Sequence, residues 1–273
     1  MNLVYPRALA VCALTLTAAT AFAQYRPGAV VAIAPSENYH VELGAGFWNP
    51  SADMQIADGA GGSTVDLKND LGLQDRKVGE FQLVIKPAVK HKIRVQFIPL
   101  RYTQTGSPRT TLTFNGQTFP AGVPVSSSLR WNAWRFGYEY DFTSTPRGFL
   151  GVIVDLKYTD VLATLTPSTS PAGGASGTAS AKAPIPALGA IGRLYLAENL
   201  SVTGELTGFA FPGGWIKSAS GHYADMDLYA MLNFVDSFGI RAGYRKFDVE
   251  YDLTSDTGTF KLSGPYLGVS LRF

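Results

Sequence analysis

Charged side chains stand at alternate positions within several apolar segments of the chain. Arg135, Glu139 and Asp141 alternate with aromatic residues between 132 and 142, and Asp155 and Lys157 alternate with aliphatic residues between 150 and 158. Successive side chains of a β-strand point to opposite faces, so each segment would have one apolar face and one charged face. Ion pairing between such faces, or conduction of ions along them, is the chemistry that this spacing allows.

The charged faces together carry acids and bases in nearly equal number. An ion-selective pore would carry a ring of one sign, whereas unpaired buried charges cost several kcal/mol each, so a balanced set favours a network of ion pairs. We expect this network to contain Arg94, Arg135, Glu139, Asp141, Asp155, Lys157, Arg193, Glu205, Asp225, Asp227, Arg241 and Arg245, and we expect Glu42, Glu80 and Lys86 to face the same interior.

Histidine chemistry is confined to one candidate among the three histidines of the chain. His222 follows Ser218 and Ser220 and precedes Asp225, which are the residue types of a Ser/His/acid hydrolase. The alternative is a histidine among ordinary loop residues, and we expect that alternative, with no catalytic residue. His40 and His91 lie at the opposite ends of their strands from His222.

Metal and thiol chemistry have little support in the sequence. Asp58, Asp66, Asp70 and Asp75 could bind a divalent cation, but their spacing lacks the glycine and the closing glutamate of a calcium loop. The one cysteine, Cys12, lies in the amino-terminal apolar run, so no disulfide or thiolate metal site is expected beyond it. We expect no cofactor and no metal.

Ten segments alternate between apolar and polar residues with a period of two, which indicates β-strands. Beyond the amino-terminal run no apolar stretch approaches the roughly 18 residues of a membrane helix, although 46% of the chain is hydrophobic. Hydrophobic residues that are abundant but spread by alternation are typical of a membrane β-barrel. The segments are 39–49, 79–88, 92–104, 132–142, 150–158, 186–196, 200–211, 223–234, 239–252 and 259–273.

The sequence therefore predicts an all-β, antiparallel up-and-down transmembrane barrel of ten strands, with eight or twelve as alternatives. Its apolar faces would contact lipid and its charged faces would fill a narrow interior. A soluble β-sandwich is the alternative, but it would have to bury the five aromatic residues of 132–142 against a second sheet.

The predicted connections alternate between short and long. The short ones are at 89–91, 143–146, 198–199 and 236–237, and the long ones are at 49–77, 106–127, 166–184 and 212–221, with a brief one at 255–258. Asn115-Gly116 indicates a type I′ turn and a hairpin within the second long connection. The Ser-, Ala-, Gly- and Pro-rich connection at 166–184 is predicted to be flexible.

The strand at 239–252 shows a change of phase. Ile240, Ala242 and Tyr244 share one face, but Phe247 and Val249 follow after an odd step. Either a β-bulge near Arg245-Lys246 restores the apolar face, or the strand leaves the bilayer there.

The amino-terminus resembles a secretory leader. Residues 1–7 carry one positive charge, residues 8–23 are apolar, and Ala21-Phe22-Ala23 is an A-x-A cleavage pattern. We expect a signal peptide at 1–23 and a single barrel domain at 24–273. Charge gives no support for a nucleic-acid partner, because 23 Lys and Arg, one of them Arg7, stand against 21 Asp and Glu.

The carboxy-terminus carries the one motif-like resemblance. Gly268, Leu271 and the final Phe273 lie in an alternating strand that resembles the assembly signal of Gram-negative outer-membrane barrels. The whole barrel segment is similar in pattern to the group of OmpA-like and OmpW-like barrels. This resemblance implies an outer-membrane location with both termini in the periplasm, recognition by the barrel-assembly machinery, and contact with outer-membrane lipid and lipopolysaccharide.

The resemblance does not imply one activity, because such barrels include anchors, channels, adhesins and enzymes. We expect a non-enzymatic protein with a structural or surface role, or a narrow passage for small solutes. Two alternatives remain: a lipid A- or surface-modifying hydrolase centred on His222, and an adhesin that acts through the long loops.

Overall fold

A computed structural model describes residues 33–58, 65–66, 68, 74–109, 111–168, 176–216, 219–253 and 256–273 of the chain. The chain divides into two units, Met1–Val30 and Val31–Phe273. The predicted signal peptide at 1–23 lies outside the described residues. In the described part of the second unit, no helix is long and apolar enough to cross a membrane.

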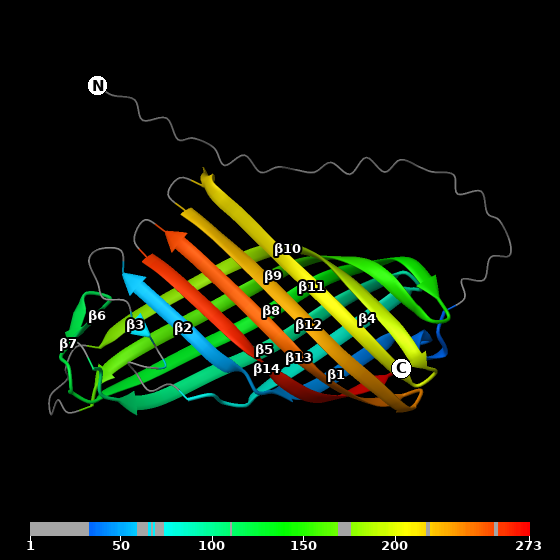
Figure 1. The fold of residues 1–273 in the computed structure, drawn as a ribbon, viewed down its shortest axis with the longest axis horizontal. Coiled ribbons are helices and arrows are strands. Elements are labelled where there is room, and N and C mark those ends of the chain that lie inside the picture. Colours follow the sequence, from blue (N-terminus) through cyan, green and yellow to red (C-terminus); the bar gives the residue numbers. More distant parts are fainter. Residues whose placement is uncertain are drawn as a thin grey trace, which may run out of the picture. The chain divides into compact units, whose positions relative to one another are not determined.

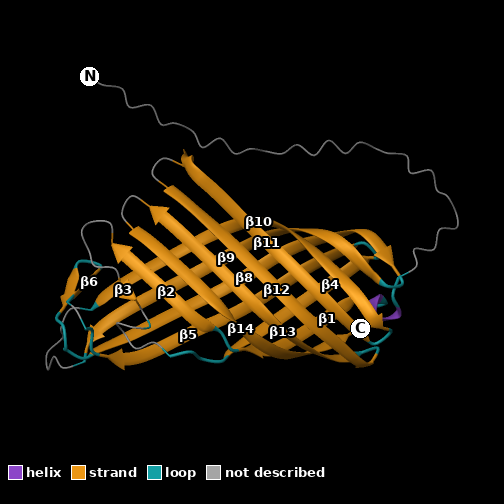
Figure 2. Cartoon of the chain, viewed as in Figure 1, coloured by secondary structure: helices purple, strands orange, loops and turns teal. Residues whose placement is uncertain are grey.

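Ten strands of the second unit form a closed antiparallel barrel (Figures 1 and 2). Consecutive strands pair around the wall, and β1 pairs with β14 to close it. The wall strands are β1 (Val41–Trp48), β4 (Val78–Ala88), β5 (His91–Gly106), β8 (Val125–Thr145), β9 (Gly148–Pro167), β10 (Gly177–Ala197), β11 (Leu200–Ile216), β12 (Ala219–Val235), β13 (Phe238–Leu253) and β14 (Asp256–Arg272). The fold class and the strand count predicted from the sequence are confirmed.

Five shorter elements complete the described chain. A 3-10 turn, η1 (Pro35–Glu37), precedes β1. Strand β2 (Ser51–Asp58) continues beyond β1 along β14, and β3 (Val65–Asp66) pairs with β2. Strands β6 (Leu112–Phe114) and β7 (Gln117–Phe119) form a hairpin.

The two ends of the barrel differ in their connections. At one end, named the turn end, strands are joined at 89–90, 146–147, 198–199 and 236–237. The chain also enters and leaves there, since the backbone N–H of His40 donates to the carbonyl of Phe273 at 2.7 Å. The opposite end, named the loop end, has the connections after β1, β5, β9, β11 and β13.

Several predicted loops are shorter than expected because the strands extend past the apolar pattern. Residues 51–58 form β2 within the connection predicted at 49–77. β9 runs to Pro167 and β10 starts at Gly177, so much of the predicted flexible loop at 166–184 is strand. Likewise β11 reaches Ile216 and β12 starts at Ala219. The extensions at 51–55 and 178–184 have polar or small residues and proline on their outward face, so alternation of hydrophobicity did not identify them.

The predicted β-bulge at Arg245-Lys246 is wrong. The pairing of β13 with β12 is regular from Asn233↔Gly239 to Ala219↔Leu253, and its pairing with β14 is regular through the same region. Phe247 and Val249 therefore continue the inward-facing set of Arg241 and Arg245, and they pack against an apolar cluster inside the barrel. The change of phase marks a change in what fills the interior.

The outward face of the wall is apolar in a broad belt. On β8, Trp134, Phe136, Tyr138, Tyr140 and Phe142 are all exposed. A tilted strand rises about 20 Å from Trp134 to Phe142, close to the roughly 25 Å apolar band of outer-membrane barrels. Soluble monomers rarely expose a continuous apolar surface of this extent.

Candidate functional site

The interior of the barrel contains almost all of the charges that the sequence places on polar faces. Among the described residues, the buried charged side chains are Glu37, Glu42, Glu80, Lys86, Lys92, Arg94, Arg135, Glu139, Asp141, Asp155, Lys157, Arg193, Glu205, Asp225, Arg241, Arg245 and Arg272. These residues, together with the half-buried Asp227, are called the interior charge network below. They come from η1 and from all ten strands of the wall, where strict alternation turns each of the strand residues inward.

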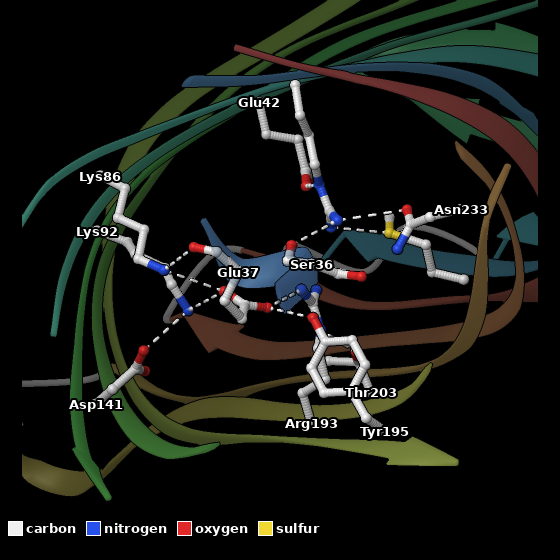
Figure 3. Close-up of polar contacts among 12 residues, drawn as sticks. Ser36, Glu37, Glu42, Lys86, Lys92, Asp141, Arg193, Tyr195, Thr203 and Asn233 are labelled. Atoms are coloured by element: carbon white, nitrogen blue, oxygen red, sulfur yellow. Dashed lines mark hydrogen bonds and ion pairs between the residues drawn. The ribbon is translucent and has the colours of Figure 1, made fainter. Parts of the chain in front are cut away.

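Glu37 is the hub of the network at the turn end (Figure 3). Its Oε1 accepts from Arg193 Nη1 at 2.6 Å and from the Tyr195 hydroxyl at 2.7 Å. Its Oε2 lies 3.3 Å from Lys86 Nζ and 3.9 Å from Lys92 Nζ. The η1 turn thus reaches into the interior and joins charges from three wall strands, β4, β5 and β10.

Opposing effects set the protonation of Glu37. Its burial alone would raise the pKa of the carboxyl group. The positive charges of Arg193, Lys92 and Lys86, with the hydrogen bond from Tyr195, outweigh burial and hold the pKa of Glu37 well below its usual range. The carboxylate is therefore ionised at neutral pH and keeps its cationic partners compensated.

A continuous chain of ion pairs leads from this hub toward the middle of the barrel. Lys92 Nζ contacts Glu139 at 2.7 Å and Asp141 at 2.9 Å. Arg94 Nη1 then joins Glu139, at 3.0 Å, to Glu205, at 2.8 Å. Each carboxylate in this series of ion pairs contacts a base from another strand, so the ion pairs link the strands of the wall across the interior.

The series of ion pairs continues on the other side of Glu205. Arg135 pairs with both Glu205 and Asp155, the latter at 2.7 Å. Asp225 receives Lys157 Nζ at 2.8 Å and Arg245 Nη2 at 2.6 Å. Two further pairs stand beside this chain: Arg241 with Glu80 and Arg272 with Glu42, each at 2.6 Å. Asp227 accepts a hydrogen bond from Tyr266 at 2.9 Å.

The composition of the network explains why so many buried charges are tolerated. In the described chain it has nine acidic and nine basic members, counting Asp227. A buried charge that loses its partner costs about 3–5 kcal/mol. The even balance means that no member needs an outside ion to be neutralised.

The other half of the interior is apolar. Beyond Arg94 on β5 come Ile98 and Leu100, and before Arg135 on β8 come Leu129 and Trp131, all buried. They belong to an apolar layer formed by Trp48, Ala52, Met54, Val78, Ile98, Leu100, Tyr102, Leu112, Phe114, Phe119, Val125, Leu129, Trp131, Leu165, Tyr229, Met231, Phe260, Leu262 and Tyr266. Tyr229 and Met231 are at its margin among the charges, where they contact Arg193 and Arg272. The sequence analysis assigned only charges to the interior and did not identify this layer.

The β6–β7 hairpin contributes to the apolar layer. Leu112, Phe114 and Phe119 are buried, and the turn between the two strands has positive φ at Asn115 (49°) and Gly116 (74°). These angles are those of the type I′ turn predicted from Asn115-Gly116. The hairpin therefore packs its apolar face onto the layer at the loop end.

One small cavity lies where the apolar layer meets the charges. Its volume is about 40 Å³, and its lining includes Trp48, Trp131 and Phe247 on one side and Arg135 and Lys157 on the other. This is room for roughly three water molecules. It is too small to hold a drug-sized ligand, which needs roughly 300 Å³ or more.

The structure does not assemble the Ser/His/acid group considered around His222. His222 is exposed on the outer wall, 3.8 Å from Asp248 and 3.9 Å from Glu250, whereas Asp225 points into the interior and pairs with Lys157 and Arg245. Ser218 lies outside the described residues. His40 and His91 are at the turn end, as expected from their place in the strands.

Two acids of the first long connection, Asp66 and Asp75, have hydrogen-bond partners within the protein. Asp75 accepts from the backbone N–H of Ala52 and from Lys68 Nζ, both at 3.1 Å. These hydrogen bonds outweigh slight burial and lower the pKa of Asp75. Asp70 lies outside the described residues. In the described part of the chain no group of three or more His, Cys, Asp and Glu residues could hold a metal ion.

Three members of the network were missed by the sequence analysis. Lys92 and Arg272 share the inward face of their strands with Arg94 and Ser270, so strict alternation could have identified them. Glu37 was not identifiable in this way, because it precedes the first strand. Only the Pro-Ser-Glu sequence, with proline in the first turn, favours the local 3-10 geometry.

The carboxy-terminal strand completes the wall. Leu271 and Phe273 are exposed on the outward face, and Gly268 opposes Gly46 across the β1–β14 seam. A Cβ atom on Gly46 would lie 2.7 Å from the carbonyl oxygen of Leu267, so the seam needs glycine there. Recognition of Gly268, Leu271 and Phe273 by the assembly machinery stays a prediction.

Comparison with solved structures identifies the fold. The outer-membrane protease OmpT from Escherichia coli superposes with a TM-score of 0.57 at 9% identity, covering 86% of this chain and 97% of OmpT. The chain has the fold of the small outer-membrane β-barrels. The translocator domain of the autotransporter NalP from Neisseria meningitidis has a TM-score of 0.46 at 12% identity, covering 86% of this chain and 88% of that domain.

A third similar structure is Ail, the attachment invasion locus protein of Yersinia pestis, with a TM-score of 0.37 at 9% identity, covering 86% of this chain and 99% of Ail. No family model matches the chain, and no curated protein matches its sequence. Because the identities are so low, the likeness extends to the fold alone.

Proposed function

We propose that this protein is a closed, non-enzymatic integral outer-membrane barrel that acts at the cell surface, with both termini on the periplasmic side. The outward apolar belt supports insertion into a bilayer, since a soluble protein would have to cover it. The loop end would then face the outside of the cell, as the longer connections do in this class of barrel.

The observation that supports a closed interior is the burial of the inward-facing side chains. From Glu37 at the turn end to Phe119 at the loop end, the network and the apolar layer consist of side chains that are at most 9% exposed, apart from Asp227. A continuous water-filled path would expose them. The interior is therefore filled first by ion pairs and then by apolar side chains, and both regions argue against a passage for solutes.

A surface role is also favoured over catalysis by the position of His222. The imidazole sits on the outer wall between two carboxylates, and the acid considered as its partner faces the interior. The OmpT likeness concerns the fold, and the protease activity of OmpT is not carried over to this chain.

Single-channel conductance in a planar bilayer tests the closed state. The refolded protein is first checked for heat-modifiable gel mobility, which shows that the barrel is closed and folded. We expect a folded sample to give no discrete current steps, while a channel of known conductance gives them in the same bilayer. Regular steps from the folded protein, altered in size by Arg135→Ala, would establish a pore and overturn the proposal.

A further inference from the structure

A row of cations crosses three neighbouring segments on the outward face of the wall near the loop end. Arg101 of β5 lies directly opposite Arg130 of β8, and both side chains are exposed. The β4–β5 pairing ends at Phe81↔Phe97, and extending its register by four residues would place Lys77 opposite Arg101 on its other side. Lys77, Arg101 and Arg130 are called the cation row below.

The position of Lys77 has independent support. A groove of about 210 Å³ is lined jointly by Gln74, Asp75 and Arg76 and by Tyr102, Thr103 and Gln104. The segment that precedes β4 therefore lies beside β5 at the height of Arg101. Lys77 is exposed there, directly after Arg76.

The cation row is not neutralised within the described part of the chain. None of its three members takes part in an ion pair there, in contrast to the interior charges. Like charges directly opposite each other on a sheet are destabilising. Two acids lie near the row. Asp75, two residues before Lys77, pairs with Lys68 at 3.1 Å, and Asp160, diagonal to Arg130, faces Lys182 on β10.

The height of the row relative to the apolar belt matches a lipid headgroup. Phe97 and Trp134 stack across β5 and β8 with ring centroids 4.3 Å apart, and aromatic rings mark the membrane interface. Arg101 and Arg130 each follow four residues farther toward the loop end. On strands tilted by about 40° this places them about 10 Å above the rings, at the level of lipid phosphates.

The part of the wall at β14, three strands away from β5, is different at a similar height. Lys261 of β14 faces Asp248 of β13 on one side and Asp53 of β2 on the other. A cation between two acids has no need of an external anion. Lys261 therefore differs from Arg101 and Arg130, which have no acid directly opposite them in the sheet.

We propose that Lys77, Arg101 and Arg130 bind the phosphate groups of an anionic lipid in the leaflet at the loop end of the barrel. Guanidinium groups form paired hydrogen bonds with phosphate oxygens, and a lysine beside them adds a point charge. The inference rests on the proposed membrane location of the barrel. It does not depend on whether the interior conducts.

The test is titration of the detergent-refolded full barrel with bisphosphorylated lipid A, with bound lipid counted by native mass spectrometry. A basic side chain near a charged membrane surface contributes about 1 kcal/mol, so each substitution should weaken binding about fivefold. We expect Arg101→Gln to lose about fivefold and the triple variant Lys77→Gln/Arg101→Gln/Arg130→Gln to lose about a hundredfold. Lys261→Gln removes one positive charge from β14, where two acids face it, and should change affinity by less than about twofold.

Two further arms identify the chemistry. Lipid A stripped of its phosphates should bind the wild-type protein no more tightly than bisphosphorylated lipid A binds the triple variant. Inorganic phosphate at millimolar concentration should not displace the bound lipid, because the apolar belt holds the acyl chains; displacement would assign the row to soluble phosphate instead. Heat-modifiable mobility shows that each variant is folded.

The result that would overturn the inference is a folded triple variant that binds bisphosphorylated lipid A within about twofold of the wild type. This failure is distinct from failure of the proposed function. Current steps from the wild type would show an open barrel and leave the lipid site intact, whereas unchanged lipid binding would remove the site and leave the closed barrel intact.

Discussion

The two halves of the interior are closed by different physical means. In the half near the turn end, bases and acids from η1 and all ten strands form ion pairs, with Glu37 and Glu205 each shared among several cations. In the half near the loop end, aromatic and aliphatic side chains pack together beneath the β6–β7 hairpin. The first half depends on matching of charge and the second on matching of volume.

This difference predicts different responses to mutation. Removing one member of a buried ion-paired set leaves a charge without compensation, and that cost depends on pH. Removing an apolar side chain leaves a cavity, and that cost depends on the space left behind. Substitutions in the two halves should therefore differ in how much they lower the free energy of unfolding and in how that loss changes with pH.

The largest effect is expected from Glu205→Ala in the charged half. Glu205 accepts ion pairs from Arg94, at 2.8 Å, and from Arg135, so its loss leaves two buried guanidinium groups short of a partner. We expect a loss of about 3–5 kcal/mol in the free energy of unfolding, measured by urea titration in lipid vesicles.

Glu198→Ala, at an exposed turn position, is the matched control and should cost less than about 0.5 kcal/mol. If Glu205→Ala cost as little as this control, the ion pairs would not hold the charged half together.

A smaller loss, about 2–4 kcal/mol, is expected from Leu262→Ala in the apolar half. Leu262 is 1% exposed and lines the small cavity with Trp131 and Phe247, so truncation enlarges a space that the rigid wall cannot close. The loss should be the same at pH 5 and pH 8. Leu267→Ala, on the outward face of the same strand, is the control and should cost less. A loss that changed strongly with pH would show that the two halves are not separate.

Glu37→Gln tests the charged half through pH. Because the pKa of folded Glu37 lies below its unfolded value of about 4.3, its stabilisation is complete above that pH and falls as the pH drops. We expect the variant to lose about 1–3 kcal/mol at pH 7. The difference from wild type should narrow below about pH 4, measured by urea titration from pH 3 to pH 8. A difference that stayed constant over this range would mean that Glu37 acts by shape rather than charge.

The same comparison explains what the sequence could and could not predict. Alternation identified the ten wall strands and predicted that Arg94, Arg135 and Glu139 face the interior. The apolar face of each strand contacts lipid, so the charged residues on the other face must point away from it. Hydrophobicity could not show whether Ile98 and Leu100 face inward or outward, because near the loop end, beyond the lipid-facing belt, an apolar residue is compatible with either face. Phe247 and Val249 gave a signal, the change of phase, but neither a bulge nor the end of the membrane-spanning part of the strand predicts that they face an apolar interior.

Other features depend on the closed barrel itself. Glu37 gains its partners only when β4, β5 and β10 are brought around the same interior, and nothing local to Pro35–Glu37 encodes that arrangement. The strand extensions at 51–58 and 177–185 depend on pairing with neighbours already in the wall, since most of their own residues are polar, small or proline. By contrast, Asn115-Gly116 predicted its turn correctly because a type I′ turn depends on two residues alone.

The smallest effect is expected at that turn, from Gly116→Ala. Gly116 has φ of 74°, a conformation that costs an L-residue about 1 kcal/mol, and no atom would crowd an added Cβ. The strain should loosen the hairpin without unfolding the wall. We expect faster proteolysis between β6 and β7, with the urea midpoint of the barrel changed by less than the Leu262→Ala variant changes it. Because Leu112, Phe114 and Phe119 join the hairpin to the apolar layer, equal losses in the two variants would mean that the hairpin and the layer unfold as one unit.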